Sequence, residues 1–570
     1  MNQLGSFDFE VEKMVMSGQT LLNQLQPRSR RGRRHALLGL AGACWLTICL
    51  VSDTHAAPPK HIDPAGVRGA LVLAGGGKLP NAIRSKFIEL AGGDQARVVV
   101  IPTASSRADE LRPEDILSQW VDSKPASLSV FHARTEAEAN DPQLLKPVRE
   151  ATGIWFTGGQ QSRLAKRYLG TRAAIEFHEV LKRQGVIGGT SAGAAIMSRV
   201  MIASGNPVPV ISQGLGLIPG AIIDQHFLKR QRQARLRAAL IQHPNLVGMG
   251  IDEGTALVVR GREIEVLGAS TVTAMLAAGA QREAVQEELK VGIRYDLTAF
   301  RRAARDRVLP VFPPPEPQAS QVATGSLVIV GGGGLPAEIV KTFIELAGGP
   351  EALIVTLPTA IPDRQARASK PPEFLAKAGA KNVRVLPHRR LDEVESKEFL
   401  ETLAKAGGVW FGGGRQWRFV DAYSDTRAEA ALKDVLKRGG VIGGSSAGAS
   451  IQASFLARGN PLGNRDIIAR GYERGLGYLP GTAIDQHFSQ RKRLADMSFL
   501  IERHPQILGI GIDEATALIV RGHMADVVGR NRVYFYNRQG SAAEDGMYYD
   551  VLGSGGKYDL KQRRIAAPMK

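Results

Sequence analysis

The chain has 570 residues, of which 44% are apolar and 22% are charged. This length exceeds one ordinary core, so we expect two or more domains, and the composition excludes a disordered chain and a polytopic membrane protein. Lysine and arginine outnumber aspartate and glutamate by 73 − 55 = 18, which favours anionic ligands. The only cysteines, Cys44 and Cys49, lie near the start, which excludes a disulfide scaffold, a cysteine zinc site and a cysteine nucleophile from the rest.

Residues 1–57 are typical of a targeting segment. Five arginines between Arg28 and Arg34 precede an apolar run at 36–51, and residues 54–56 then offer small side chains to a signal peptidase. Paired arginines before such a run also resemble the twin-arginine export signal. We therefore expect export to the periplasm or the exterior, and a cytoplasmic protein if the segment is not functional. An apolar run this short would span a bilayer poorly, so we expect no stable membrane span after processing.

The remaining sequence is an internal duplication. Residues 69–80 recur as 325–336 at an offset of 256, and residues 188–194 recur as 443–449 at an offset of 255. Solenoid repeats have periods of roughly 20 to 50 residues, so a period this long indicates two tandem domains.

The duplication also sets the predicted domain boundaries. We predict a first domain over 66–300 and a second over 323–560. The segment 301–322 contains a proline-rich stretch at 310–317, which favours an extended, semi-rigid linker. Two similar halves on one chain are also compatible with their packing as a pseudo-dimer.

Within each half, short β-branched runs alternate with amphipathic stretches. The runs of the first half lie at 71–74, 98–101, 153–156 and 185–187. Ile83 and Phe87, after the first run, show helical spacing, as do Phe177 and Val180 before the fourth. This pattern predicts an α/β fold in each half, with a doubly wound and mostly parallel sheet. Sites in such sheets form at the carboxyl ends of the strands, so we expect one cleft in each half.

A serine in each half lies in a G-x-S-x-G pattern. Ser191 occupies it at 189–193 and Ser446 at 444–448, each after strand-like residues and before an alanine-rich stretch. The glycines permit a tight strand-to-helix turn that projects the serine into a cleft, which suits a nucleophile. A purely structural glycine-rich turn is the alternative.

Three pairs of histidines recur between the halves. His226 and its copy His487 lie in the sequence Ile-Asp-Gln-His-Phe, among polar residues that a core would disfavour, and we interpret them as general bases. The other pairs are interpreted as core or helix-capping residues; they are His132 with His388 and His243 with His504.

A general base also needs a group that orients its imidazole. No Asp or Glu lies between Ser191 and Asp224, so two recurring candidates remain, Asp224 itself and Glu253, 27 residues beyond His226. We favour Glu253 and keep Asp252 as the alternative, since an Asp at a strand end often caps a turn. The corresponding residues of the second half are Asp485, Asp513 and Glu514. A carboxylate partner would raise the pKa of the histidine.

Four motifs in a fixed order carry a resemblance to a known family. F-x-G-G-x-Q, G-G-[TS]-S-A-G-A, I-D-Q-H-F followed by arginines, and G-I-D-E-x-T-A-L resemble the cyanophycinases, serine peptidases of the peptidase E clan, over roughly 66–275 and 322–535. The resemblance implies a fold of the class I glutamine amidotransferase-like or peptidase E-like type. It implies a Ser, His and Glu triad, which here would be Ser191, His226, Glu253, Ser446, His487 and Glu514. The implied substrate is cyanophycin, a polyaspartate with arginine on each β-carboxyl, released as β-Asp-Arg dipeptides.

The resemblance also implies substrate-binding residues. In this sequence they would be Gln161, Asp224, Gln225, Arg230, Arg232 and Arg235, and in the second half Gln416, Asp485, Gln486, Arg491 and Arg493. Guanidinium groups suit substrate carboxylates, and acidic or amide groups suit the substrate's arginine. The second half has Asp496 where the first has Arg235. We therefore expect the second site to bind substrate more weakly and the first to carry most of the activity.

Glycines and the residue after each serine are the expected oxyanion donors. We assign the N–H groups of Ala192 and of the loop Gly158–Gly159, with Gly159 as the second donor; the copies are Ala447 and Gly414. The glycine run at 75–77 resembles a phosphate loop only superficially and is interpreted as a structural turn. No motif indicates a metal, nucleotide or flavin, so we expect neither cofactor nor metal.

Two other functions are compatible with the sequence. One is a peptidase for other β-aspartyl or Asp-containing peptides. The other is a non-catalytic basic binding protein, against which the retention of Ser, His and Glu in both halves argues. The expected partner is a polymeric peptide, and we expect no nucleic acid.

Overall fold

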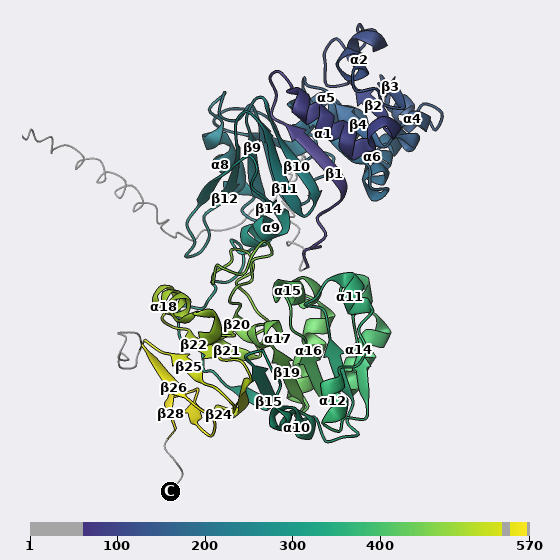
Figure 1. Ribbon diagram of the computed structural model, residues 1–570. Coiled ribbons are helices and arrows are strands. Elements are labelled where there is room, and N and C mark those ends of the chain that lie inside the picture. Colours follow the sequence, from purple (N-terminus) through teal and green to yellow (C-terminus); the bar gives the residue numbers. More distant parts are fainter. Residues whose placement is uncertain (1–60, 539–547, 567–570) are drawn as a thin grey trace, which may run out of the picture. The chain divides into compact units, whose positions relative to one another are not determined.

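The computed structural model describes residues 61–538 and 548–566. The predicted targeting segment, 1–57, lies outside these residues. Among the residues described, no helix has the length and apolarity needed to cross a membrane. Each half of the duplication forms a large sheet with helices and a smaller second sheet (Figure 1).

The large sheet of the first half has the strand order β14-β11-β10-β1-β5-β4-β2-β3. Its strands are β1 (Val67–Ala74), β2 (Arg97–Ile101), β3 (Ser127–Val130), β4 (Gly153–Phe156), β5 (Val186–Thr190), β10 (Thr255–Gly261), β11 (Glu263–Gly268) and β14 (Tyr295–Asp296). Strands β1 to β5 run parallel, and β10, β11 and β14 add an antiparallel edge. The four predicted strands of this half are confirmed as β1, β2, β4 and β5.

Alternating side chains of the central strands face two helical layers. Leu71 packs with Phe177 of α6 (Arg172–Lys182), whereas its neighbour Val72 packs in a separate cluster with Phe87 of α1 (Asn81–Ala91). Helices on both faces of a largely parallel sheet confirm the predicted α/β fold. The remaining helices before β5 are α2 (Pro113–Val121), α3 (Glu136–Asn140), α4 (Lys146–Glu150) and α5 (Gln161–Tyr168).

A second sheet, which the sequence pattern does not predict, follows β5. Its order is β13-β12-β9-β8. The strands are β8 (Ala221–Gln225), β9 (Val247–Ile251), β12 (Val272–Leu276) and β13 (Val285–Leu289); α7 (Ala192–Ala195) and a hairpin of β6 (Val200–Ser204) and β7 (Val210–Gln213) precede them. Helix α8 (Gln233–Gln242) connects β8 to β9, which are parallel neighbours. Short apolar runs look alike in sequence whichever sheet they join, so the pattern could not assign β8 and β9 to a separate sheet.

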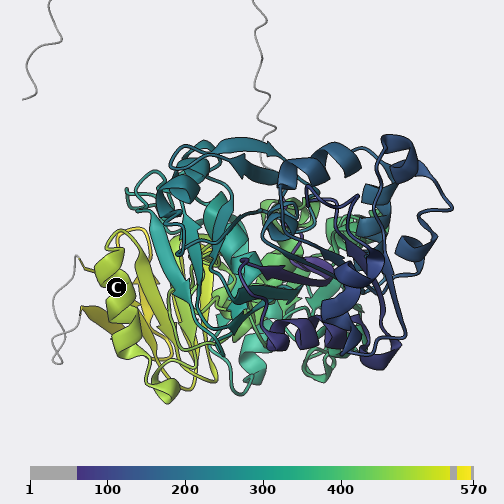
Figure 2. The same ribbon diagram turned by 90° about the horizontal axis from the view of Figure 1, so that it is seen from above.

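The second half repeats both sheets. The large sheet has the order β17-β16-β18-β19-β15-β23-β24-β27-β28, and the small sheet β20-β21-β22-β25-β26. In Figure 2 the last strands of the chain, in yellow, run side by side. The strands are β15 (Val322–Val330), β16 (Ile354–Leu357), β17 (Val383–Val385), β18 (Gly408–Phe411), β19 (Val441–Ser445), β20 (Ala453–Phe455), β21 (Leu479–Gln486), β22 (Leu508–Ile512), β23 (Thr516–Gly522), β24 (Met524–Gly529), β25 (Val533–Tyr536), β26 (Tyr549–Leu552), β27 (Lys557–Asp559) and β28 (Arg564–Ile565). The helices are α10 (Ala337–Leu346), α11 (Asp363–Arg367), α12 (Glu373–Lys377), α13 (Leu391–Val394), α14 (Lys397–Lys405), α15 (Trp417–Tyr423), α16 (Arg427–Lys437), α17 (Ala447–Ser450) and α18 (Leu494–Arg503).

The predicted linker is packed against its surroundings. Helix α9 (Leu297–Arg305) runs across the predicted boundary at residue 300, and β15 begins at Val322, just before the predicted second domain. Phe312, in the proline-rich stretch, stacks on Phe455 of the second half at 6.1 Å between ring centroids. The proline-rich stretch therefore packs against the second half as well as connecting the two halves.

Candidate active site

Each predicted nucleophile lies at a strained turn between a strand and a short helix. Ser191 separates β5 from α7 and has a φ of 51°, and Ser446, between β19 and α17, has a φ of 57°. A non-glycine residue rarely adopts such an angle, and the conformation persists only where its surroundings enforce it. A Cβ atom at Gly193 would lie 2.2 Å from the Phe156 carbonyl oxygen, so the turn can pack closely against β4 only with glycine there.

The structure brings the predicted Ser, His and Glu together in both halves. Ser191 Oγ lies 2.8 Å from His226 Nε2, and His226 Nδ1 lies 2.6 Å from Glu253 Oε1. The second half repeats this arrangement, with 3.0 Å between Ser446 Oγ and His487 Nε2 and 2.5 Å between His487 Nδ1 and Glu514 Oε1. A serine, a base and an orienting acid in hydrogen-bond contact form the arrangement used in nucleophilic catalysis.

The small sheet explains how the base and the acid meet. His226 directly follows β8, and Glu253 comes two residues after the end of β9. Because β8 and β9 are parallel neighbours, their carboxyl ends lie at the same edge. Asp252 has another set of contacts: its Oδ1 accepts hydrogen bonds from the backbone N–H groups of Leu228 and Lys229, at 3.1 and 3.0 Å. It therefore fixes the loop that follows His226, as expected for a turn cap.

The glycine run at 75–77 packs against the base and the acid. The His226 N–H donates to the Gly75 carbonyl at 2.7 Å. A Cβ at Gly76 would lie 2.2 Å from His226 Cε1, and one at Gly77 would lie 3.0 Å from Glu253 Oε2. The equivalent residues of the second half are Gly331, Gly332 and Gly333. The sequence predicts a turn here but not this contact, for which the only signal is the recurrence of three glycines in both halves.

Burial lowers the pKa of His226 below its ordinary value of about 6.5. The hydrogen bond with Glu253 raises the pKa, and the positive charge of Arg230 lowers it again, so the net direction is downward. The same balance of burial, Glu514 and Arg491 lowers the pKa of His487. The expected upward shift is therefore wrong, because burial outweighs the carboxylate. A lowered pKa favours the neutral imidazole, which is the form that can accept a proton.

A glycine loop lies beside each nucleophile. The Thr157 N–H donates to Ile101 O at 3.1 Å and the Gln160 N–H donates to Ala104 O at 2.9 Å, which fixes the loop on both sides of Gly158 and Gly159. A Cβ at Gly158 would lie 3.7 Å from Ser191 Cβ, whereas one at Gly159 would lie 2.1 Å from Ala104 O. In the second half, the glycine beside Ser446 is Gly413, and Gly414 lies against Ala360. The loops thus approach the nucleophiles without side chains, as an oxyanion site requires.

The candidate substrate-binding residues differ in exposure. Arg230 and Arg491 are exposed next to the histidines. Gln161 and Gln416 are buried, and their amide nitrogens donate to backbone carbonyls at 2.8 and 2.9 Å. Gln225 Oε1 accepts from Arg232. Gln486 Oε1 is buried and has no hydrogen-bond partner within the described part of the chain.

Arg235 is committed to a carboxylate of the protein. Its guanidinium is 4% exposed; Nε donates to Asp224 Oδ2 at 2.9 Å and Nη2 donates to Asp224 Oδ1. In the second half, Asp485 receives a hydrogen bond from Arg493 at 2.8 Å and one from Arg458 at 2.9 Å. Because Arg235 binds Asp224, it is not free to pair with a substrate carboxylate as expected, and Asp485 keeps two arginine partners. The presence of Asp496 therefore gives no reason to expect a weaker second site.

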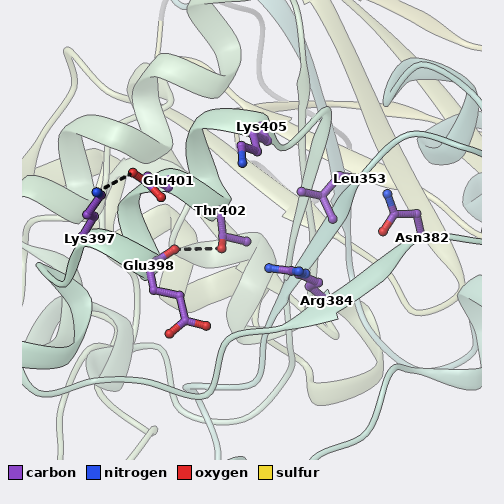
Figure 3. Close-up of a pocket in the computed structure, with 8 residues that line it drawn as sticks. All are labelled: Leu353, Asn382, Arg384, Lys397, Glu398, Glu401, Thr402 and Lys405. Atoms are coloured by element: carbon purple, nitrogen blue, oxygen red, sulfur yellow. Dashed lines mark hydrogen bonds and ion pairs between the residues drawn. The ribbon is translucent and has the colours of Figure 1, made fainter.

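Two of the cavities in the second half differ in their position relative to the nucleophile. One, of about 270 Å³, adjoins the nucleophile loop and is lined in part by Lys370, Phe374, Gly413 and Ser445. The other, of about 480 Å³, is shown in Figure 3 and lies between α14 and the residues that precede β16 and β17. Those are the amino ends of the strands, opposite the carboxyl ends that carry the triad, so only the first cavity is part of the candidate site.

A family model described as Peptidase family S51 matches residues 71–267 and 327–528. The chain belongs to peptidase family S51. It is a serine peptidase with two tandem cyanophycinase-like copies, and each matched range contains the Ser, His and Glu of one half.

Named relatives support this assignment. The cyanophycinase of Geminocystis herdmanii is 38% identical over 200 residues, which cover 34% of this chain and 73% of the relative. The cyanophycinase of Thermosynechococcus vestitus is 33% identical over 241 residues, covering 38% and 74%. Among solved structures, a peptidase from an acI-B1 Actinobacterium is 22% identical, with a TM-score of 0.32 over 41% of this chain and 98% of that one.

Proposed function

We propose that this S51 peptidase hydrolyses cyanophycin and releases β-Asp-Arg dipeptides as an exopeptidase, with one active site in each half. One observation carries the proposal: the hydrogen-bonded Ser, His and Glu occur in both halves of a chain whose named relatives are cyanophycinases. A binding protein would need neither the positioned imidazole nor the carboxylate.

The geometry supports an acyl-enzyme mechanism. Ser191 Oγ attacks the carbonyl carbon while His226 Nε2 accepts its proton, and Glu253 accepts the Nδ1–H and stabilises the imidazolium. The N–H groups of Ala192 and of the Gly158–Gly159 loop bind the oxyanion. His226 then protonates the leaving amine, and a water activated by the same imidazole hydrolyses the acyl-enzyme. The second half uses Ser446, His487, Glu514, Ala447 and the Gly413–Gly414 loop in the same way.

Charges around the triad suit a substrate that carries both carboxylates and guanidinium groups. The exposed Arg230 and Arg491 can pair with a free carboxylate of the polymer. The buried acceptor Gln486 Oε1, next to His487, can accept a hydrogen bond from a substrate guanidinium. The cavity beside Gly413 offers room for a side chain.

The proposal is tested by incubating the full chain with purified cyanophycin and identifying the products by mass spectrometry. We expect β-Asp-Arg, with activity unaffected by EDTA because no step needs a metal. The double variant Ser191→Ala, Ser446→Ala is the control and should lose several orders of magnitude in rate. Cleavage of simple β-aspartyl dipeptides without attack on cyanophycin would instead assign the enzyme to other β-aspartyl substrates. Loss of activity with EDTA and recovery with zinc would refute the serine mechanism.

We infer that residues 1–57 direct export, on the basis of the arginines, the apolar run and the small residues after it. In a bacterial host, replacement of both arginine pairs by lysine, at Arg30, Arg31, Arg33 and Arg34, should retain the protein in the cytoplasm if the twin-arginine route is used. Export that persists unchanged would exclude that route.

A further inference from the structure

The two halves hold the same buried carboxylate with arginines from different segments. In the first half, Asp224 is paired with Arg235 of α8. In the second half, Asp485 is paired with Arg458, which follows β20 and is 2% exposed. The equivalent helix position in α18 carries Asp496.

The positions of the two arginines correspond reciprocally. Gln161 donates to the carbonyl of Ala203, and its copy Gln416 donates to the carbonyl of Arg458, both at 2.9 Å, so residues 203 and 458 are equivalent. The arginine has therefore moved from the helix to the segment after β20. The residue left at the helix position, Asp496, accepts a hydrogen bond from Arg458 Nη2 at 2.5 Å, so the exchange of residues keeps the charges paired.

We propose that Arg458 is the positioning residue of the second active site, that it replaces Arg235, and that the two sites are therefore equally competent. The inference rests on the proposed function only in taking Ser446 as a nucleophile. It concerns the carboxylate that supports the base, and Arg458 touches no reacting atom.

The contacts show how Arg458 acts on the base. Asp485 lies in β21, two residues before His487, whose φ of 50° requires a fixed backbone. Arg493 Nη1 donates both to Asp485 and to the Gln486 carbonyl, at 2.8 and 2.7 Å. Arg458 supplies the other guanidinium to Asp485, so the end of β21 is held from two sides. Without Arg458, the buried carboxylate would lose one of its two cationic partners, and the turn at His487 would lose a restraint.

The test isolates the second site with Ser191→Ala and measures two quantities. One is the rate at which a fluorophosphonate probe modifies Ser446, and the other is kcat/KM on cyanophycin as a function of pH. Arg458→Ala should lower both about 10- to 100-fold, as expected for a lost charge-assisted hydrogen bond. The double variant Arg458→Ala, Asp496→Arg returns the arginine to its place in the first half and should recover both to within about fivefold of the parent. Asp496→Arg alone should raise neither the probe rate nor kcat/KM, since Arg458 already binds the Asp485 carboxylate.

The first half provides the matched control in a Ser446→Ala background. Arg235→Asp should lower the probe rate and kcat/KM of the first site, and the additional change Ala203→Arg should restore both. The inference is overturned if Arg458→Ala leaves the probe rate and the pH profile unchanged, if Asp496→Arg alone raises activity, or if the double variant folds, as judged by its melting temperature, without recovering. If the parent does not cleave cyanophycin but Ser446 still reacts with the probe, the proposed substrate fails while the probe rates still decide the role of Arg458.

Discussion

Arg230 and Glu253 act in opposite directions on the pKa of the His226 imidazole. A neutral imidazole accepts the serine proton, so kcat/KM should rise through an apparent pKa below about 6.5 and be level by neutral pH. Arg230→Gln removes a charge that lowers this pKa and should move the acidic limb to higher pH. We would measure the profile of the first site in a Ser446→Ala background, with Arg230→Lys, which keeps the charge, as the control. If the limb stays in place in Arg230→Gln, Arg230 does not contribute, and burial and Glu253 set the pKa of His226 without it.

The two carboxylates that follow β9 have separable roles. Glu253→Gln cannot accept the Nδ1–H in the same way and should lower kcat by about 10³- to 10⁴-fold at the first site. Asp252→Asn keeps an oxygen that can accept from the Leu228 and Lys229 N–H groups, so its effect should stay below about tenfold. Single-turnover kinetics in the Ser446→Ala background would measure both. The assignment of the orienting acid is wrong if the Asp252 variant proves to be the more damaged.

The turn that begins after β15 limits the space around the second base. A Cβ at Gly332 would lie 2.3 Å from His487 Cε1, whereas a Cβ at Gly334, two residues on, would meet no atom of the described residues within 4 Å. Gly332→Ala should therefore displace the imidazole and lower kcat/KM of the second site at least about 100-fold, since misplacement by about 1 Å can cost that much. Gly334→Ala is the matched control and should be nearly silent, as the first half has Lys78 at this position. Equal activities of the two variants in a Ser191→Ala background would contradict the steric argument.

Elements that depend on local pattern could be predicted from the sequence, and contacts between distant segments could not. The strands at 71–74 and 98–101 and the serine turns follow from periodicity and glycine spacing, which act within a few residues. The second sheet could not be predicted, because it depends on which strands pair and not on the pattern within any one strand. The arginine that binds Asp485 is Arg458, which lies 27 positions before it in the chain. A comparison of the α18 segment with α8 shows only that an arginine is missing from the helix. Matching the motifs of the two halves thus predicts the Ser, His and Glu of each site, but it overlooks one arginine beside Asp485.

At the scale of the whole molecule, the duplication does not predict how the halves meet. Arg262 of the first half and Asp421 of the second are joined at 2.5 Å, yet their counterparts in the opposite halves are His523 and Lys166. A two-fold pseudo-dimer would use equivalent residues on both sides. This ion pair is therefore not repeated with the roles of the two halves exchanged, and the second half contributes to it from α15.

Asp421 is the centre of this contact and gives the final prediction. Its carboxylate, 8% exposed, also accepts hydrogen bonds from Arg302 at 3.0 Å and Tyr472 at 2.7 Å. Asp421→Asn would leave the buried Arg302 guanidinium without its ion-pair partner and Arg262 with Asp296 as its remaining carboxylate. This loss should cost about 3 to 5 kcal/mol of unfolding free energy and split calorimetric unfolding into two transitions. Asp425→Asn is the control. It removes the ion pair between Arg305 and Asp425, and because the Asp425 side chain is 36% exposed, the loss should cost less than about 1 kcal/mol of unfolding free energy. If both variants unfold like the parent in one transition, the halves are held together by apolar packing of the linker, and the buried ion pairs contribute nothing to their association.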